Sequence, residues 1–304
     1  MPTRTLSHAG FAAVELTTPA LRLVAVHGTG PRIAWLSRPA GDNLLQWDEN
    51  SPLQCARESE AKRPWHMRGG HRVWTARMGA DEDEQTYAND DAPGTCTTTV
   101  DGFTVTGALC AETRTQRSIS VRVLRGDRLE VVNRIVNRGN MLLGCGLWAI
   151  TCTRPSPHTR YVVPLGDGSC WDTATITVFR CWAGHGTGTF REDQGELTDD
   201  AYVLTPRGRE TKRMVQTPAG AIAMIDPARD LTFAISAPWQ RGAPYPANAN
   251  IAMYVSPQNF LVEMETMGPH TVLKSGEVLE HRQEWTLAQG AIPLTGAAVR
   301  AFTA

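Results

Sequence analysis

Short runs in which apolar and polar residues alternate recur along most of the chain, and no other feature of the sequence constrains its fold as strongly. Alternation with a period of two places the apolar side chains on one face of a β-strand. β-Branched residues, which favour strands, are frequent in these runs. We therefore expect strands at Phe11–Thr17, Leu21–Val26, Arg32–Ser37, Arg72–Arg77, Cys96–Val100, Phe103–Leu109, Ser118–Leu124, Leu129–Asn137, Met141–Thr151, Thr173–Phe179, Ala221–Ile225, Leu231–Ser236, Ile251–Val255, Phe260–Thr266 and Arg282–Leu287.

Turn-forming residues separate the expected strands. Asp101-Gly102 lies between two runs rich in Thr and Val and predicts a hairpin turn, because both central positions of such a turn must accept positive φ. Gly126-Asp127 and Gly139-Asn140 predict further turns, and Lys274–Glu277 predicts a loop.

Helical patterns are scarce. Leu53–Lys62 fits one short helix, and the Ala-rich tail after Pro293 fits another. Gly184–Asp200, which is rich in Gly and acidic residues, predicts a long loop over one end of a sheet. Because strands do not alternate with helices, we do not expect a Rossmann or TIM-barrel fold. We expect one all-β domain of sandwich type over residues 1–304.

The charge balance excludes several kinds of partner. The chain has 304 residues with 30 Lys+Arg against 31 Asp+Glu, so a basic surface for nucleic acid or for a membrane is not expected. The longest apolar runs, such as Met141–Ile150, are about half as long as a membrane span. The N-terminal residues lack the continuous apolar core of a signal peptide, so we expect a cytoplasmic location.

No local motif indicates a metal ion or a cofactor. The seven Cys form no CxxC pair, and neither HExxH nor a carboxylate-cage spacing occurs. We therefore expect no metal and no cofactor, while a metal site assembled from distant His and Glu residues stays open. Cys170 and Cys181, in a stretch rich in Gly, Trp and His, are the cysteines that we retain as candidates for reactivity.

The first candidate site is Pro64–Thr75 (PWHMRGGHRVWT), which brings His66, His71, Arg72 and Trp74 together in sequence. Tyr87 and two carboxylates, Asp90 and Asp91, follow soon after. An arginine side chain can bind hydroxyls or a carboxylate through its fork of donors, and an indole can pack on the apolar face of a sugar. Alternation places His71 on one face of the strand and Arg72 and Trp74 on the other.

The second candidate site is Phe260–Pro269 (FLVEMETMGP). In a strand, Leu261, Glu263 and Glu265 share one face, and Val262 and Met264 share the other. Two carboxylates on one apolar face are costly to bury, so they are either solvated or part of a site. Neighbouring negative charges raise the pKa of one carboxylate, which suits a general acid or base.

Two further stretches have the composition of binding segments. Trp148 is followed by His158, and Trp239–Asn250 (WQRGAPYPANAN) contributes Trp239, Tyr245 and Asn250 as ligand-binding candidates. By contrast, we expect His8 and His281 at the surface.

The order of several motifs resembles the galactose mutarotase-like superfamily, to which the aldose 1-epimerases belong, and indicates a little-characterised branch of it. The motifs that carry the resemblance are Gly30–Ile33 with Gly41–Leu45, His66 with Gly69-Gly70 and Trp74, Leu129–Asn137, Tyr245-Pro246, Phe260–Pro269, Leu273–Glu277, His281 and Glu284–Leu287. The resemblance implies a large antiparallel β-sandwich with a sugar site on one open face. It also implies a His acid and a Glu base, the base at Glu263 or Glu265 and an N-terminal His near His66 or His71.

One departure from the family is important. The central Asn-His-x-Tyr/Phe-Phe-Asn motif, which supplies the acid His, is absent, and Leu147–Ile150 takes its place. We expect His71 to act as the acid or as an orienting group, with His158 as the other possibility.

Together these features favour an epimerase or isomerase that acts on a sugar or sugar-like metabolite through Glu and His. A non-catalytic carbohydrate-binding protein, and a recruited lyase, hydrolase or cyclase on the same scaffold, remain as alternatives. The 9 Trp, several of them in the candidate segments, and the near-zero net charge suit a neutral sugar-like ligand. We expect a monomer or a homodimer.

Overall fold

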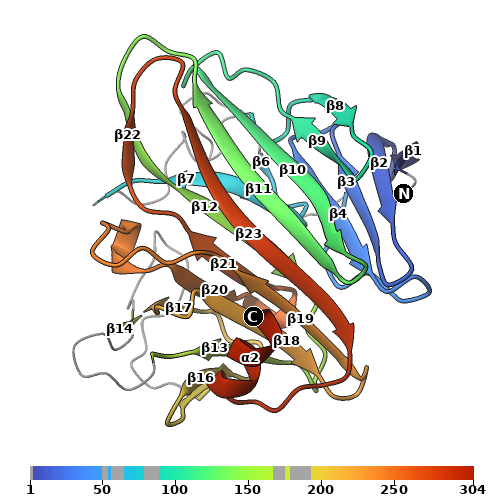
Figure 1. Ribbon diagram of the computed structural model, residues 1–304, viewed down its shortest axis with the longest axis vertical. Coiled ribbons are helices and arrows are strands. Elements are labelled where there is room, and N and C mark those ends of the chain that lie inside the picture. The colour runs from blue at the N-terminus through green and yellow to red at the C-terminus, as the bar shows by residue number, and fades with distance from the viewer. Residues whose placement is uncertain (1–2, 50–53, 56–64, 79–88, 167–174, 179–192) are drawn as a thin grey trace.

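The strands form two large antiparallel sheets that face each other. The structure, a computed structural model, describes residues 3–49, 54–55, 65–78, 89–166, 175–178 and 193–304. Figure 1 shows the two layers, with the long strand β23 crossing the molecule. The expectation of an all-β antiparallel sandwich is confirmed.

In the described residues the first sheet has 11 strands. They are, in spatial order, β1 (Thr3–His8), β2 (Phe11–Thr17), β3 (Arg22–Val26), β4 (Arg32–Ser37), β7 (His71–Ala76), β12 (Leu143–Thr153), β21 (Val262–Met267), β20 (Ile251–Val255), β17 (Thr211–Gln216) and β14 (Thr175–Val178), with β22 (Thr271–Leu273) paired to β12.

The second sheet has 10 strands in the same part of the chain. They are β15 (Gly195–Leu197), β16 (Ala201–Leu204), β13 (Arg160–Pro164), β18 (Ala221–Asp226), β19 (Leu231–Ser236), β23 (Val278–Gln289), β11 (Arg128–Asn137), β10 (Thr115–Arg125), β9 (Gly102–Thr106) and β8 (Thr95–Thr98). The smaller elements are β5 (Gln54–Cys55) paired with β6 (Trp65–His66), two single 3-10 turns at Pro246–Asn248 and Pro257–Asn259, and the helix α2 (Gly296–Thr303).

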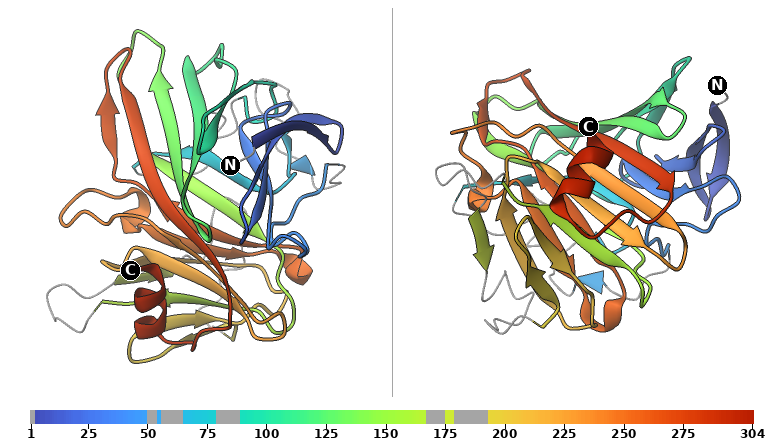
Figure 2. Two further views of the ribbon diagram at one scale, coloured as in Figure 1. Left: turned by 45° about the vertical axis from the view of Figure 1, so that its right-hand side comes forward. Right: turned by 60° about the horizontal axis from the view of Figure 1, so that its bottom comes forward.

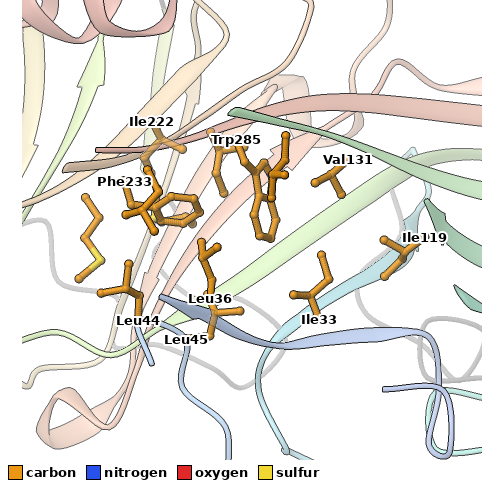
Figure 3. Close-up of a cluster of buried hydrophobic side chains, with 14 of the residues drawn as sticks. Ile33, Leu36, Leu44, Leu45, Ile119, Val131, Ile222, Phe233 and Trp285 are labelled. Carbon is orange, nitrogen blue, oxygen red and sulfur yellow. The ribbon is translucent and has the colours of Figure 1, made fainter. Parts of the chain in front are cut away.

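The hydrophobic core fills the space between the sheets. Ile33 and Leu36 of β4 point towards Phe233 and Trp285 of the second sheet, as Figure 3 shows. Trp285 is 1% exposed and meets the ring of Phe233 edge-on, with ring centroids 5.4 Å apart. The apolar residues that make strands alternate are therefore the residues that join the two layers.

The C-terminal helix covers the outer face of part of the second sheet. α2 packs on β13, β18 and β19, and Figure 2 shows the helix lying over the sheet. The side chain of Val299 is fully buried there. The side chain of Thr295 caps its first turn by accepting a hydrogen bond from Ala298 N at 3.2 Å. The expected helix after Pro293 is thus confirmed. No helix of the described residues is long and apolar enough to cross a membrane.

Some expectations about individual elements were incomplete. β13 and β16 were not predicted, because they are buried on both faces beneath α2 and so do not alternate. The expected helix at Leu53–Lys62 is described only at Gln54–Cys55, which form strand β5. The expected loop Gly184–Asp200 contains strand β15, and its residues 184–192 lie outside the described part of the chain.

A polar network crosses the core and joins the two sheets. His71 of β7 bonds through Nδ1 to Thr151 Oγ1 of β12 at 2.9 Å and through Nε2 to Asn133 Oδ1 of β11 at 3.0 Å. Asn133 Nδ2 donates to Gln283 Oε1 at 3.2 Å, and Gln283 Nε2 donates to Thr266 Oγ1 at 2.8 Å. Every member is buried, so its polar atoms need these partners.

Trp285 sets the direction of this network. Its indole N–H donates only, and it bonds to Gln283 Oε1 at 3.2 Å, so that oxygen must accept. Asn133 then accepts from His71 Nε2–H, which leaves His71 Nδ1 to accept from Thr151. At the other end, Thr266 Oγ1 lies 2.6 Å from Nε2 of His281. The expectation that His281 is at the surface was wrong, because His281 is buried in the core.

Both histidines are neutral in the folded protein. Burial lowers the pKa of His71 to about 3, although its bond to Asn133 opposes the change. Burial lowers the pKa of His281 to about 4. In the unfolded chain both titrate near pH 6.5. The folded state therefore binds fewer protons than the unfolded state below that pH.

We predict that this difference makes the protein less stable as the pH is lowered. Above pH ~6.5 the two histidines cost no stability. Below it, each lowers the free energy of unfolding by up to ~1.4 kcal/mol per pH unit, until the pH reaches about 3 for His71 and about 4 for His281. Urea unfolding between pH 7.5 and 5 measures the slope. His71→Gln should flatten it, and His158→Gln, at an exposed turn, serves as the control. Equal slopes in all three proteins would contradict a buried neutral His71.

Candidate functional site

The outer face of the first sheet carries a buried cluster of charged side chains. It is built on five neighbouring strands, β7, β12, β21, β20 and β17. In β21 the side chains alternate between the two faces of the sheet. Val262 and Met264 point into the core, whereas Leu261, Glu263 and Glu265 lie on the outer face. The antiparallel registers bring the charges together, because Ile150 of β12 lies opposite both Arg72 of β7 and Glu265 of β21.

Arg72 and Glu263 form the first ion pair of the cluster. Arg72 Nη2 donates to Glu263 Oε1 at 3.1 Å, and Arg72 Nη1 donates to Cys152 Sγ at 3.1 Å. The side chains are 2% and 8% exposed. Of the two carboxylate oxygens of Glu263, only Oε1 accepts hydrogen bonds from the described residues. Oε2 accepts none from them, so it can bind a ligand.

Lys212 and Glu265 form the second ion pair. Lys212 Nζ lies 2.5 Å from Glu265 Oε1, and the indole N–H of Trp148 donates to Oε2 at 2.6 Å. Glu265 is fully buried. Its burial raises its pKa to about 7 and Glu263 adds to the increase, while Lys212 and Trp148 oppose it. Burial therefore makes the carboxyl group of Glu265 easier to protonate than an ordinary carboxyl group.

Two indoles hold the cations in place. The guanidinium of Arg72 lies 4.2 Å from the ring centre of Trp74, and the ammonium of Lys212 lies 4.8 Å from that of Trp148. The two indoles meet edge-on, with centroids 5.8 Å apart. Each is only 3% exposed, so neither offers a free face for stacking on a sugar in this structure. Their role here is to bind cations from the π face.

A further carboxylate fixes one of these indoles. The N–H of Trp74 donates to Asp90 Oδ2 at 3.2 Å, and the same oxygen accepts from Arg32 Nη2 at 2.6 Å. Arg32 is fully buried and also donates to the carbonyl of Gly69 at 3.1 Å. Asp90 thereby connects the Pro64–Thr75 segment to β4. It also fixes the orientation of the Trp74 indole, over whose ring the Arg72 guanidinium lies.

Cys152 contributes a thiol rather than a nucleophilic thiolate. Burial raises its pKa to about 12, which the neighbouring Arg72 does not reverse. Its S–H points to Glu263 Oε1, with the two atoms 3.5 Å apart. Cys152 therefore acts as a donor to Glu263 at neutral pH.

The structure brings some of the expected site residues together and separates others. Arg72, Trp74, Trp148, Glu263 and Glu265 converge on the outer face. His71 does not converge with them, because it points the other way into the core network.

The remaining candidates have other environments. His66 lies in β6, where its backbone N–H bonds to Asp91, and His158 is exposed in the turn between β12 and β13. Asn250 bonds through both its amide N and O to the backbone of Thr217, and Tyr245 accepts from the backbone N–H of Gln240.

Trp239 is half-buried in the loop that follows β19 of the second sheet. Tyr87, Cys170 and Cys181 lie outside the described residues.

Two residues of the site were missed from the sequence. Lys212 lies in β17, where two adjacent basic residues in TKRMVQ obscure the alternation of a buried strand. Tyr254 of β20 lies beside Lys212, with the ammonium 5.7 Å from its ring centre, and its hydroxyl donates to Glu210. Met214, two residues after Lys212, shares its face of β17 and packs in the same buried cluster as Trp148.

The described residues contain no group of three His, Cys, Asp or Glu side chains placed to hold a metal ion. The carboxylates Glu263, Glu265 and Asp90 each accept a hydrogen bond from a basic side chain.

We predict that removing one partner of the first ion pair strongly destabilises the fold. Arg72→Met leaves the Glu263 carboxylate buried without its partner and should lower the free energy of unfolding by ~3–5 kcal/mol. Arg122→Met is the control, because Arg122 pairs with Glu130 at the surface and its loss should cost less than ~1 kcal/mol. Urea unfolding at pH 7.5 measures both values, and equal values would contradict the burial of the cluster.

Known structures share this fold. No family model matches the chain, and no curated protein matches it in sequence. A candidate aldose 1-epimerase from Escherichia coli K12 aligns with a TM-score of 0.60 at 13% identity, over 95% of this chain and 99% of that one. A galactose mutarotase-like protein from Clostridium acetobutylicum aligns with a TM-score of 0.59 at 8% identity, over 95% and 99%.

A galactose mutarotase-like protein from Lactobacillus casei aligns with a TM-score of 0.58 at 11% identity, over 94% of this chain and 100% of that one. All three neighbours are 13% identical to this chain or less, so the comparison shows a shared fold. The chain therefore has the galactose mutarotase-like fold.

Proposed function

We propose that this protein is an enzyme that epimerises or isomerises a sugar or sugar-like metabolite by acid–base catalysis at the outer-face cluster. One observation carries the proposal. Two carboxylates, Glu263 and Glu265, lie side by side on the outer face of β21, almost fully buried, and each has its own cation. Burial of four charged groups is costly, and a cluster of this kind is typical of a functional site.

The two carboxylates have different environments, which suits different roles in proton transfer. Glu263 is paired with Arg72, and one of its oxygens is available for a ligand hydroxyl. Glu265 has a pKa raised to about 7 by burial. A pair of titratable groups whose environments differ in this way can supply a base and an acid at the same pH.

The charges of the cluster favour a neutral ligand. Among the described residues, Arg72 and Lys212 are matched by Glu263 and Glu265, and Arg32 is matched by Asp90. An anionic ligand would add an unmatched negative charge to a buried site. A polyhydroxylated ligand exchanges hydrogen bonds with these groups without that cost.

The names of the structural neighbours, a candidate aldose 1-epimerase and galactose mutarotase-like proteins, support a carbohydrate-related role at the level of the fold. The fold hosts more than one reaction, so the site carries the more specific proposal. The expected acid His71 points into the core, and the acid must therefore come from another residue.

A non-catalytic carbohydrate-binding protein is the second candidate. It is favoured by the extent to which the cluster satisfies itself, since both indole N–H groups and both carboxylates already have partners within the protein. Such a site binds hydroxyls without moving protons.

We predict that the wild-type protein accelerates the exchange between the α and β anomers of at least one sugar in a panel of neutral aldoses. The panel contains glucose, galactose, mannose, xylose, arabinose and rhamnose, and NMR magnetisation exchange of the anomeric protons measures the rate. Loss of the H2 signal in D2O reports epimerisation at C2 in the same samples.

Removal of either carboxylate should reduce that rate. Glu263→Gln and Glu265→Gln each remove a proton acceptor while keeping the shape of the side chain, and general acid–base steps contribute ~10²–10⁴-fold. Glu196→Gln, at an exposed position of β15, is the control and should keep the wild-type rate. Full activity of both site variants would contradict the proposal, and saturable binding without exchange would favour the second candidate.

A further inference from the structure

We propose that Lys212 is the general acid of the site, acting together with Glu265, and that Glu263, held by Arg72, is the base. This inference rests on the proposed function and deepens it, because it assigns a separate role to each carboxylate. It also assigns a catalytic residue that no sequence motif indicated. Three observations carry it: the identity of the two cations, the geometry around the Lys212 ammonium, and the free oxygen of Glu263.

The first observation is that the two carboxylates have different kinds of cation. A guanidinium keeps all its protons at any ordinary pH, so Arg72 can hold Glu263 through an ion pair but cannot act as an acid. An ammonium carries protons that it can release when it is buried. Of the two cations in the cluster, only Lys212 is therefore chemically able to deliver a proton to a ligand.

The second observation is the short contact between Lys212 and Glu265. Nζ and Oε1 are 2.5 Å apart, and both side chains are almost fully buried. Trp148 lies beneath the ammonium, Tyr254 lies beside it, and the Tyr254 hydroxyl is anchored by Glu210 at 2.7 Å. The lysine is thus held by residues of three other strands, β12, β20 and β21, and does not sample the many conformations of a surface lysine.

The third observation concerns Glu263. Its Oε1 accepts from Arg72 and from Cys152, while Oε2 accepts no hydrogen bond from the described residues. A carboxylate with one oxygen anchored and one oxygen free is oriented to take a proton from a ligand hydroxyl. Both oxygens of Glu265 are already occupied, by Lys212 and by Trp148, so Glu265 is less suited to that task.

The groups around Glu265 raise its pKa while Lys212 stays in hydrogen-bond contact with it. Lys212 faces it from β17 and Trp148 from β12, while Glu263 precedes it on β21, with Arg72 and Cys152 behind Glu263. Burial and the negative charge of Glu263 raise the pKa of Glu265 to about 7, against the effect of Lys212.

The proton movements balance in a ring opening of a cyclic hemiacetal. Glu263 Oε2 takes the proton of the anomeric hydroxyl, and the electron pair of that O–H bond forms the carbonyl. The bond from the anomeric carbon to the ring oxygen breaks, and the ring oxygen takes a proton from Lys212. Rotation of the carbonyl group followed by the reverse steps gives the other anomer and restores both residues.

Lys212→Arg is the variant that separates an acid from a structural cation. It keeps the positive charge beside Glu265 but cannot release a proton, so we expect anomeric exchange to fall by ~10²–10⁴-fold with the sugar that the wild type converts. A residue that merely neutralises Glu265 would be replaced by arginine with little loss. Lys274→Arg, at an exposed loop, is the matched control and should keep the wild-type rate.

A titration of Glu265 gives a second readout that does not depend on activity. In protein with 13C-labelled Glu carboxyl groups, the Glu265 signal is assigned by its absence in Glu265→Gln. Lys212→Met should raise its midpoint by at least about one pH unit, because the ammonium that favours the carboxylate is lost. Lys212→Arg should leave the midpoint at or below the wild-type value.

Each outcome decides the question. Loss of exchange in Lys212→Arg together with the shifted midpoint in Lys212→Met supports the proposal. Wild-type exchange and an unchanged pH profile in Lys212→Arg overturn it and leave the proposed function intact. An equal Glu265 midpoint in wild type and Lys212→Met also overturns it. If the wild type exchanges no sugar of the panel, the proposed function and this inference fall together.

The single variant Lys212→Met leaves a buried carboxylate without its cation, which lowers the stability of the fold. The double variant Lys212→Met/Glu265→Gln removes both charges and should recover stability relative to Lys212→Met. Its exchange rate should be as low as that of Lys212→Arg, and wild-type exchange in the double variant would overturn the assignment.

Discussion

The burial of two carboxylates on one face of a β-strand is the constraint on which the rest of the site depends. Glu263 and Glu265 are two residues apart on β21, so their side chains point the same way and repel each other. Two cations from strands on either side of β21, Arg72 of β7 and Lys212 of β17, compensate them. The arrangement requires β7, β12, β21, β20 and β17 to lie next to one another, as the sheet order provides.

Tryptophan has a different role here from the one that its abundance first indicates. Nine Trp in a chain with a candidate sugar site favour stacking on sugar rings. Trp74 and Trp148 instead use their π faces to hold Arg72 and Lys212, and use their N–H groups to bind Asp90 and Glu265. A third, Trp285, directs the hydrogen bonds between the sheets. Indole is suited to all three positions because it is large, apolar and a donor only.

Alternation in the sequence predicted much of the fold and part of the site. It placed Arg72 and Trp74 on one face of their strand with His71 on the other, and it placed both glutamates on one face. The same alternation places His71 on the strand face opposite Arg72. The prediction that His71 belongs to the site came instead from the resemblance to the family motifs. Position relative to the partner sheet, which decides the environment of His71 and His281, is a tertiary property that no local pattern contains.

Other parts of the site depend on strand neighbours far apart in sequence. Lys212 and Glu265 are 53 residues apart, and their contact follows from pairing through β20. β17 was missed because Lys212 and Arg213 are charged and buried, contrary to the usual distribution of such residues. Strands β13 and β16 were missed for the opposite reason, since burial on both faces removes the alternation.

The central claim is that a sugar binds at the outer face of β7, β12 and β21, and the indole N–H signals test it most directly. In a 1H–15N spectrum recorded during titration with the neutral aldoses, the signals of Trp74 and Trp148 should move, because their N–H groups bond to Asp90 and Glu265 within the cluster. The signal of Trp285, whose N–H bonds to Gln283 between the sheets, should stay in place. Assignment by single Trp→Phe variants makes the comparison unambiguous. Shifts confined to other indoles, with Trp74 and Trp148 unchanged at saturation, would contradict the claim.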